Sequence, residues 1–395
     1  MARARTTKFA AVTAIVLAIL PGPVAYAARV VDSDGPQWPN APLPALQSDA
    51  PGRGAKADSF EARWPSISDD IVGSIPSPSV PRTPWLGEER AASNPFVRSG
   101  PSAFDGDLGL RYWFNWAKTG KDLYDIPGDA LVSRLTYDGM YGNSGEGFGR
   151  LDHTSGFYTK GYLGGGLFAK GQLKDEDFPP TTTPYSSTLS SLSGSSLGYA
   201  NVDLGFNFWR DQTFRIGGFT GYHYFNQRVH AYGCNQIAGN TSICGTTPVS
   251  DSIQVIEQDN SWHSLRVGVD ADLKIGDKIT LRADAAYLPY VKMYGMDLHH
   301  LRIGTTVGDF AGGIPEDGAG RGYQFEASIA YAVDENVSLA VGGRYWHMEA
   351  SGQTHFEGNV VGTTTSPQPV NWSTDIYGVF VQGSFKFGPY PTSSF

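Results

Sequence analysis

The chain of 395 residues contains only two cysteines and five methionines, and its main part has no long apolar run. After the first 20 residues, no stretch approaches the ~20 apolar residues that a membrane-spanning helix requires, so we expect no such helix. Two cysteines are too few for a cysteine-based metal site, and we predict no bound metal. The net charge of −9, from 30 basic and 39 acidic residues, argues against nucleic acid as a partner.

The first residues have the order of a targeting signal. Three basic residues precede the apolar run 10–20, and Ala25-Tyr26-Ala27 supplies a small-x-small cleavage site. This order predicts a signal peptide over residues 1–27 and an exported protein.

The predicted export bears on the state of the two cysteines. Cys234 and Cys244 are separated by nine residues in a polar segment that carries glycine and asparagine. An even pair this close in an exported protein predicts a disulfide that closes a loop.

Composition divides the rest of the chain. Residues 28–104 are rich in Pro, Ser, Asp and Ala and show no apolar periodicity. This predicts a flexible N-terminal extension without a core of its own. Alternating segments begin at Asp105, so we expect a β domain over 105–387, followed by a short C-terminal tail over 388–395.

Glycine and aromatic residues are abundant: the chain has 49 Gly, 21 Phe, 20 Tyr and 9 Trp. Segments of about ten residues alternate apolar and polar side chains, as strands with two unlike faces do. Leu265, Val267 and Val269 share one face, for example, and Arg266 and Asp270 share the other. Because the polar faces carry charges of both signs, the pattern predicts an all-β fold, an antiparallel transmembrane β-barrel with a charged lumen. A secreted β-sandwich, which would also alternate, is the alternative.

Ten strands are predicted, near residues 106–117, 130–141, 157–170, 197–208, 214–229, 261–274, 279–293, 323–332, 337–349 and 373–387. Short connections at 209–213, 276–278 and 333–336 alternate with long ones at 118–129, 171–196, 230–260, 294–322 and 350–372. The connection at 142–156 is expected to extend its flanking strands in part. Since outer-membrane barrels keep short turns on the periplasmic side, the long loops are expected to be extracellular. Trp113 and Trp346 are expected to face the lumen.

Two polar motifs follow strands that end on this same side of the barrel. "KDEDFPP" contains Asp175 and Asp177, and "MDLHHLR" contains Asp297 and His299. In extended backbone, residues two apart share a face. Asp297 could fix the tautomer of His299, which would then act as a general base toward water. Asp175 and Asp177 are close like charges, which raises one pKa and lets the pair hold a proton.

Two further interpretations concern the neighbouring histidine. His300 is expected to face away from His299 and to be solvated. A metal site built from Asp297, His299, His300 and Asp175 is an alternative, but acid–base chemistry explains the spacing with fewer assumptions.

From about residue 105 to 387, the chain resembles the omptin family, ten-stranded outer-membrane endopeptidases of Gram-negative bacteria. The matching segments, in order and spacing, are "VSRLTYD" (132–138), "KDEDF" (174–178), "GYANVDLGF" (198–206) and "FRIGGFTGYHY" (214–224). The resemblance implies that Asp175 and Asp177 are the catalytic aspartate couple and that Asp297 and His299 are the catalytic dyad.

The chain departs from the family at the substrate-binding positions. Two acids that pair with a basic substrate side chain in the family fall here on Gly295 and on Lys121, with Asp122 beside it. A segment without the family's Ser-x-His-Pro signature leaves Ser190 as the nearest equivalent. These departures predict a cleavage preference other than dibasic, for small, apolar or acidic residues.

The resemblance also sets expectations for lipid and location. The family requires lipopolysaccharide, and Tyr222 is the one residue that matches its lipid-binding set. We therefore expect a cell-surface endopeptidase in the bacterial outer membrane, with its active face extracellular, a peptide or protein substrate, and no cofactor besides lipopolysaccharide. A non-enzymatic barrel with a relic groove, such as an adhesin, a small pore or an envelope-structural protein, is the alternative.

Overall fold

The computed structural model describes residues 103–178, 183–240, 242–303, 310–357 and 366–388. The expected signal peptide lies outside these residues, as do almost all of the expected extension and tail. Throughout the described part of the chain, no helix is long and apolar enough to cross a membrane.

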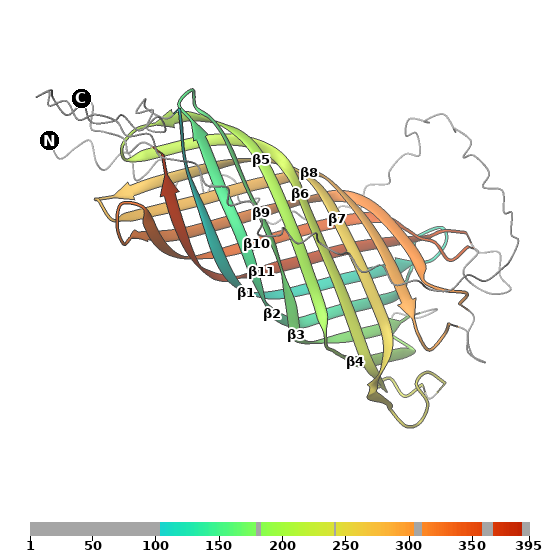
Figure 1. The fold of residues 1–395 in the computed structure, drawn as a ribbon. Helices are drawn as coiled ribbons and strands as arrows, with labels where there is room; N and C mark the ends of the chain where they lie inside the picture. The colour runs from blue at the N-terminus through green and yellow to red at the C-terminus, as the bar shows by residue number, and fades with distance from the viewer. Residues whose placement is uncertain (1–102, 179–182, 241, 304–309, 358–365, 389–395) are drawn as a thin grey trace, which may run out of the picture. The chain divides into compact units, whose positions relative to one another are not determined.

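The described residues form a closed antiparallel sheet. The strands are β1 (Phe104–Tyr124), β2 (Leu131–His153), β3 (Phe157–Asp177), β4 (Ser186–Leu192), β5 (Ser195–Arg210), β6 (Phe214–Gln236), β7 (Val249–Ile275), β8 (Ile279–His299), β9 (Ile314–Ala332), β10 (Val337–Thr354) and β11 (Gln368–Phe387). β1 pairs with both β2 and β11, which closes the ring β1–β2–β3–β5–β6–β7–β8–β9–β10–β11 (Figure 1). The all-β, ten-stranded barrel predicted from the sequence is confirmed.

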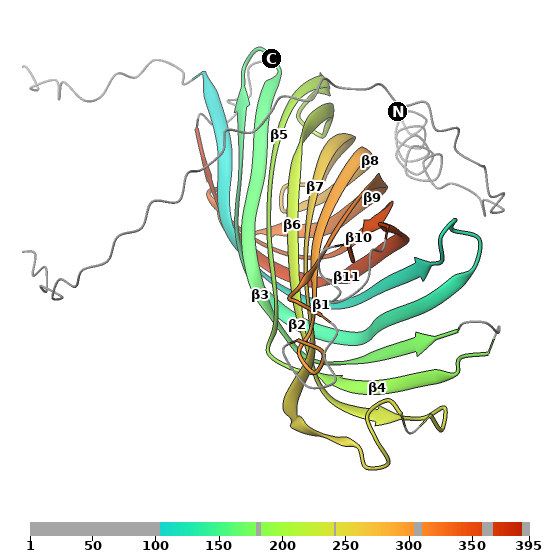
Figure 2. The ribbon, with the colours of Figure 1, turned by 90° about the vertical axis from the view of Figure 1, so that its right-hand side faces the viewer.

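β4 and β5 share one position in this ring. Both pair with β3 on one side and with β6 on the other, and β4 lies at one end of the barrel (Figures 1 and 2). The break falls at Ser193 and Gly194, and Gly194 has a φ of 64°, which glycine adopts without steric cost. Residues 186–192 are therefore the outer part of an interrupted strand, and the prediction of a loop there is wrong.

The other strands are also longer than predicted. β1 continues past residue 117 to Tyr124, β7 begins at Val249, and β8 continues to His299. Large parts of all five predicted long loops are therefore strand. In these parts most outward side chains are polar, as Lys118 and Asp122 are on β1, so the apolar alternation weakens although backbone pairing continues. The connection at 142–156 does extend its flanking strands, as expected.

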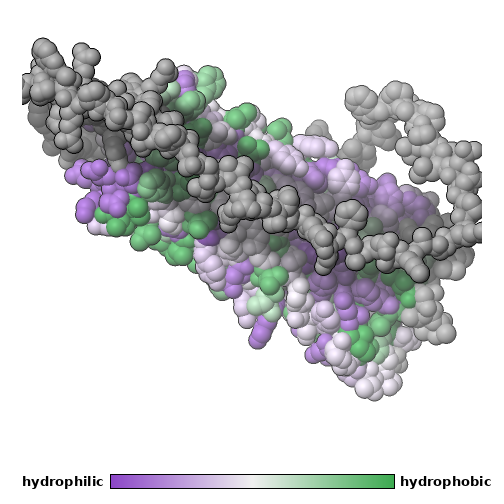
Figure 3. All heavy atoms as spheres, in the orientation of Figure 1, coloured by the Kyte–Doolittle hydropathy of each residue, from purple (hydrophilic) through white to green (hydrophobic). Residues whose placement is uncertain are grey.

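One part of the barrel surface is apolar. The outward side chains there include Leu108, Leu110, Leu163, Leu204, Val267, Ile329, Leu339, Val341, Val379, Val381 and Phe385. They lie toward the short turns, and Figure 3 shows hydrophobic residues gathered over the left half of the barrel. A membrane-spanning strand needs about 9–11 residues, whereas β7 has 27. The other half of the barrel, which we call the rim half, therefore extends beyond the membrane.

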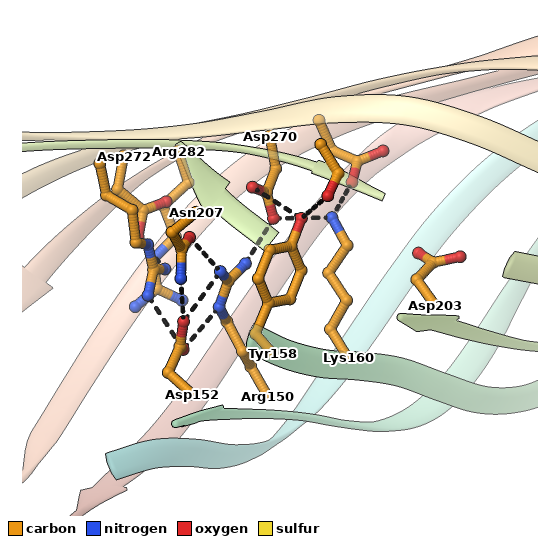
Figure 4. Close-up of polar contacts among 12 residues, drawn as sticks. Arg150, Asp152, Tyr158, Lys160, Asp203, Asn207, Asp270, Asp272 and Arg282 are labelled. Carbon is orange, nitrogen blue, oxygen red and sulfur yellow. Dashed lines mark hydrogen bonds and ion pairs between the residues drawn. The ribbon is translucent and has the colours of Figure 1, made fainter. Parts of the chain in front are cut away.

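Ion pairs cross the middle of the lumen. Arg344 and Arg111 both bind Glu146 and Glu326, at 2.7–2.9 Å. Nearer the short turns, a second network joins Arg150, Asp152, Tyr158, Lys160, Asn207 and Asp270 (Figure 4). Each charge removed from water thus has a partner of opposite sign, as burial requires.

Aromatic rings fill the lumen above these networks. Trp113 and Trp346 are buried, as predicted, with ring centroids 5.0 Å apart. Tyr199 packs against both rings. A cavity of about 130 Å³ remains among the charged side chains. A lumen so filled and crossed by ion pairs is a poor channel.

The two cysteines lie at the rim end of β6. A disulfide joins Cys234, in β6, to Cys244, in the connection to β7. We expect the unreduced protein to show this link by mass spectrometry, whereas two free thiols would contradict it. The link should stabilise its loop by roughly 2–3 kcal/mol in the chain-entropy model. Cys234→Ser should therefore speed proteolytic nicking of the 237–248 connection and leave the hydrogen-bonded barrel intact.

Candidate active site

Asp297 and His299 lie on the last residues of β8, not in a loop as predicted. Both face the lumen, because they continue the inward series that includes Val291 and Met293. The Nε2 atom of His299 lies 3.1 Å from Oδ2 of Asp297. The side chain of Asp297 is 6% exposed and that of His299 is 20% exposed. The dyad is therefore formed within one strand and opens to solvent on the histidine side.

Asp175 and Asp177 are the last inward residues of β3, so they too lie on a strand and not in a loop. They continue the inward face of Leu173, which is fully buried. Asp175 pairs in register with Leu135 of β2 and Thr188 of β4. Thr188 is therefore the residue beside Asp175, whereas Ser190, the nearest equivalent of the family's serine, pairs with Leu173. Pairing with β2 on one side and β4 on the other holds the aspartate pair at the rim.

The two pairs interact electrostatically across the lumen. Burial, followed by the negative charge of Asp177, raises the pKa of Asp175 to about 7, and the charge of His299 opposes this shift. Burial acts to lower the pKa of His299, but the Asp297 carboxylate outweighs it and raises the pKa. The nearby charges of His299 and Lys121 overcome burial and lower the pKa of Asp297. Near neutral pH, Asp175 can therefore hold or release a proton.

Lys121 is buried in the lumen on β1, in a segment that the sequence predicts to be part of a long connection. Its ammonium group lies 2.6 Å from Oδ2 of Asp297 and also forms an ion pair with Glu316. Burial acts to lower the pKa of Lys121, but the two carboxylates raise it overall. The dyad aspartate therefore has two hydrogen-bond partners, His299 and Lys121.

Glu316 is the site residue that sequence reasoning missed. It lies on β9, is 2% exposed, and accepts hydrogen bonds from Gln258 (2.9 Å) and Thr354 (3.2 Å). Its segment is predicted as loop, and only the register that pairs Gly295 with Glu316 reveals it. A Cβ atom at Gly295 would lie 2.9 Å from a Glu316 oxygen. Glycine at 295 thus makes room for a carboxylate on the adjacent strand.

Two other predicted substrate and lipid residues lie outside the lumen. Asp122 faces outward and binds Arg134 of β2 at 2.7 and 2.9 Å, so the interpretation that places it in the pocket is wrong. Tyr222 is 46% exposed on the outer surface, with its hydroxyl 2.5 Å from Nδ1 of His263. Neither side chain lies beside the four rim residues.

The segment after β8 covers part of the dyad. The ring of Phe310, which is 4% exposed, meets the His299 ring edge to face at 5.6 Å. The guanidinium of Arg302 lies 3.8 Å from the centre of the Phe310 ring. His300 points elsewhere, as expected, with Nε2 3.7 Å from a Glu257 oxygen, but this nitrogen is buried and not solvated. Phe310 thus shields His299 from water on one side and leaves the side toward Asp175 for chemistry.

The groups at the rim favour acid–base chemistry. Within the described residues, no cluster of three or more His, Cys, Asp or Glu side chains could hold a metal ion. A bonded histidine can take a proton from water, and a carboxyl with a pKa near 7 can hold one beside it. This arrangement can activate water without a serine or cysteine nucleophile.

The raised pKa of Asp175 predicts a pH-dependent effect on stability. Its pKa is about 7 in the folded protein against an ordinary 3.8, so the folded state binds the proton more tightly. Stability is therefore lost as pH rises from about 4 to 7. We expect Asp175→Asn to raise the free energy of unfolding at about pH 8.5 and to leave it nearly unchanged near pH 4, by urea titration in lipid vesicles. Glu176→Gln, on the outward face, is the control, and an equal gain in both variants would refute the electrostatic cause.

Comparison with known proteins gives one family. A model described as the Omptin family matches residues 159–368. This segment contains the aspartate pair and the Asp297–His299 dyad. A search of curated proteins found no match. The crystal structure of the outer membrane protease OmpT from Escherichia coli is 14% identical, covers 73% of this chain and 97% of its own, and has a TM-score of 0.58. The outer membrane protein OprG from Pseudomonas aeruginosa is 9% identical, over 73% of this chain and 99% of its own, with a TM-score of only 0.32.

Proposed function

Because the chain belongs to the omptin family, it is an outer-membrane barrel of the protease type, and we propose that it is an endopeptidase that uses the four rim residues to activate water. The observation that carries the proposal is the bonded dyad of Asp297 and His299 opposite the aspartate pair of Asp175 and Asp177. Each pair lies on one strand, and the charges of the two pairs shift one another's pKa values.

The proposed reaction begins with a water molecule between His299 and Asp175. Asp297 holds Nε2 of His299, which leaves Nδ1 to accept a proton from the water as its oxygen attacks the peptide carbonyl carbon. The imidazolium then returns the proton to the amide nitrogen as the C–N bond breaks. A peptide and water thus become a carboxylic acid and an amine. Asp175 keeps the attacking water oriented, with a proton held between the two aspartates.

We propose that the rim faces the outside of the cell. Outer-membrane barrels keep short turns in the periplasm and long connections outside. The four residues lie in the rim half, at the end with the long connections and beyond the apolar part of the barrel surface. The groove would then meet peptides and proteins in the surrounding medium.

Lipopolysaccharide is proposed as a requirement for activity, as the family implies. Tyr222, His263 and Tyr294 form an outward cluster on β6, β7 and β8, and we assign to it the lipid contact. Omission of lipopolysaccharide from the refolded protein should abolish cleavage, and Tyr222→Ala should raise the lipid concentration needed for half-maximal activity.

The test of the proposed function is digestion of a degenerate peptide library by the refolded protein with lipopolysaccharide present. New amino termini, identified by mass spectrometry, would support a protease. An intact library would favour a non-enzymatic barrel. Among such alternatives, a pore is opposed by the filled lumen, since Arg111 and Arg344 cross it with both of their acidic partners.

A further inference from the structure

Lys121 places a buried ammonium group directly beside the dyad. It is 2% exposed and lies between carboxylates from two other strands, Asp297 on β8 and Glu316 on β9. The Trp372 ring lies beneath it, with the ring centre 5.2 Å from Nζ. A cation thus occupies an acidic site that three strands build.

The acidic site contains acceptor oxygens that Lys121 does not use. Oδ1 of Asp297 and Oε1 of Gln258 are both buried acceptors without a protein hydrogen-bond donor in the described structure. Glu316 is held in place by Gln258 and Thr354 and not only by the lysine. The carboxylates are therefore positioned by the barrel itself and would remain if the ammonium were removed.

We propose that Lys121 is a specificity-determining residue, a built-in occupant that keeps the basic side chains of substrates out of this acidic site. The proposal rests on the proposed function and names its substrate class, which is a peptide with an uncharged side chain at the cleaved bond. A substrate lysine or arginine would have to displace the ammonium of Lys121 from two carboxylates or lie against it as a like charge. An uncharged side chain meets neither obstacle.

The proposal makes a prediction about the shortened side chain. Lys121→Ala removes the atoms of n-propylammonium and leaves Asp297 and Glu316 facing an unfilled site. External n-propylammonium should then bind there and stabilise the fold, because a ligand that binds only the folded state shifts unfolding by mass action. The wild-type protein, whose site is filled, should not respond.

The binding experiment measures the unfolding temperature of refolded Lys121→Ala against n-propylammonium concentration at about pH 8. We expect a saturable rise in Lys121→Ala and none in the wild type, and 1-propanol should have no effect on either. Lys118→Ala is the matched control, since Lys118 faces outward on the same strand and its side chain is 55% exposed. Absence of a specific response in a folded Lys121→Ala would overturn the proposal.

A second variant covers the outcome in which Lys121→Ala does not fold. Refolding that succeeds only with n-propylammonium supports the proposal. If refolding fails under both conditions, Lys121→Met combined with Glu316→Gln removes the cation and one acid together. This double variant should fold. Its ratio of kcat/KM for a lysine peptide to kcat/KM for the matching norleucine peptide should be higher than that of the wild type. An unchanged ratio would overturn the proposal.

The cleavage experiment compares peptides that differ only in lysine or norleucine at the cut. The wild type should favour norleucine by about 30-fold or more in kcat/KM, the factor for an unpaired buried charge of about 2 kcal/mol, and Lys121→Ala should reverse the order. Faster cleavage of the lysine peptide by the wild type would overturn the proposal while the protease stands. Ammonium binding by Lys121→Ala with no cleavage by any variant would support the site and refute the proposed function.

Discussion

Replacement of His299 by alanine should lower the rate of peptide hydrolysis by about 10²–10⁴-fold, the range of a general base, and leave the barrel folded. Among the described rim residues, the imidazole is the only group that is both hydrogen-bonded to the Asp297 carboxylate and partly exposed to solvent. Asp175→Ala should have an effect of similar size, because its carboxyl is the one that holds a proton near neutral pH. The measurement is kcat on a cleaved library peptide with lipopolysaccharide present.

His300→Ala is the matched control for this result. His300 is the next residue in the chain, but it lies beside Glu257 and not in the groove. It should retain nearly full activity, and all three variants should keep the heat-modifiable gel migration of a folded barrel. Full activity in His299→Ala or Asp175→Ala would show that hydrolysis, if observed, takes place elsewhere.

Removal of Glu146 should destabilise the barrel by about 3–5 kcal/mol, the cost of leaving a buried charge without its partner. The side chains of Glu146 and Arg344 are both fully buried, and Arg111 binds the same carboxylate. Glu146→Ala would leave the two guanidinium groups to share Glu326. The measurement is the urea midpoint of unfolding in lipid vesicles.

Asp138→Ala supplies the comparison for this prediction. Asp138 pairs with Lys118 at 3.1 Å on the outer surface, where both side chains are more than half exposed. Exposed pairs contribute about 0–1 kcal/mol, so this variant should unfold nearly as the wild type does. A similar loss in both variants would mean that the lumen network contributes no more than a surface pair.

The membrane-embedded part of the fold could be predicted from the sequence because lipid imposes a contrast there. Leu265 and Val267 face outward and Arg266 faces inward, and this alternation repeats around the ring. In the rim half, water replaces lipid outside the barrel, so the outward residues become polar and the contrast disappears. The same reason explains why β4 was missed and why Asp175 and His299 were expected just beyond strands when they lie on them.

The candidate site was only partly accessible to sequence reasoning. The spacing of two residues predicted that Asp297 and His299 share a face, and a hydrogen bond joins them. No local pattern indicates that Lys121 crosses the lumen to Asp297, because that contact joins residues on strands far apart in the chain. Glu316 depends on the register between β8 and β9, which a single sequence does not contain.

The length of the strands sets how far from the lipid the protein can work. At about 3.3 Å per residue and a tilt of about 40°, the 27 residues of β7 rise roughly 65–70 Å. Asp297 and His299 lie level with Gln258 and Ile256 of β7, and subtraction of an apolar band of about 25 Å places them roughly 20 Å above the membrane surface. A chain anchored in the same membrane would need about six extended residues to reach that height. The proposed peptidase could therefore cleave free chains and membrane-anchored chains with longer unfolded segments, and peptide bonds closer to the lipid would not reach the rim residues.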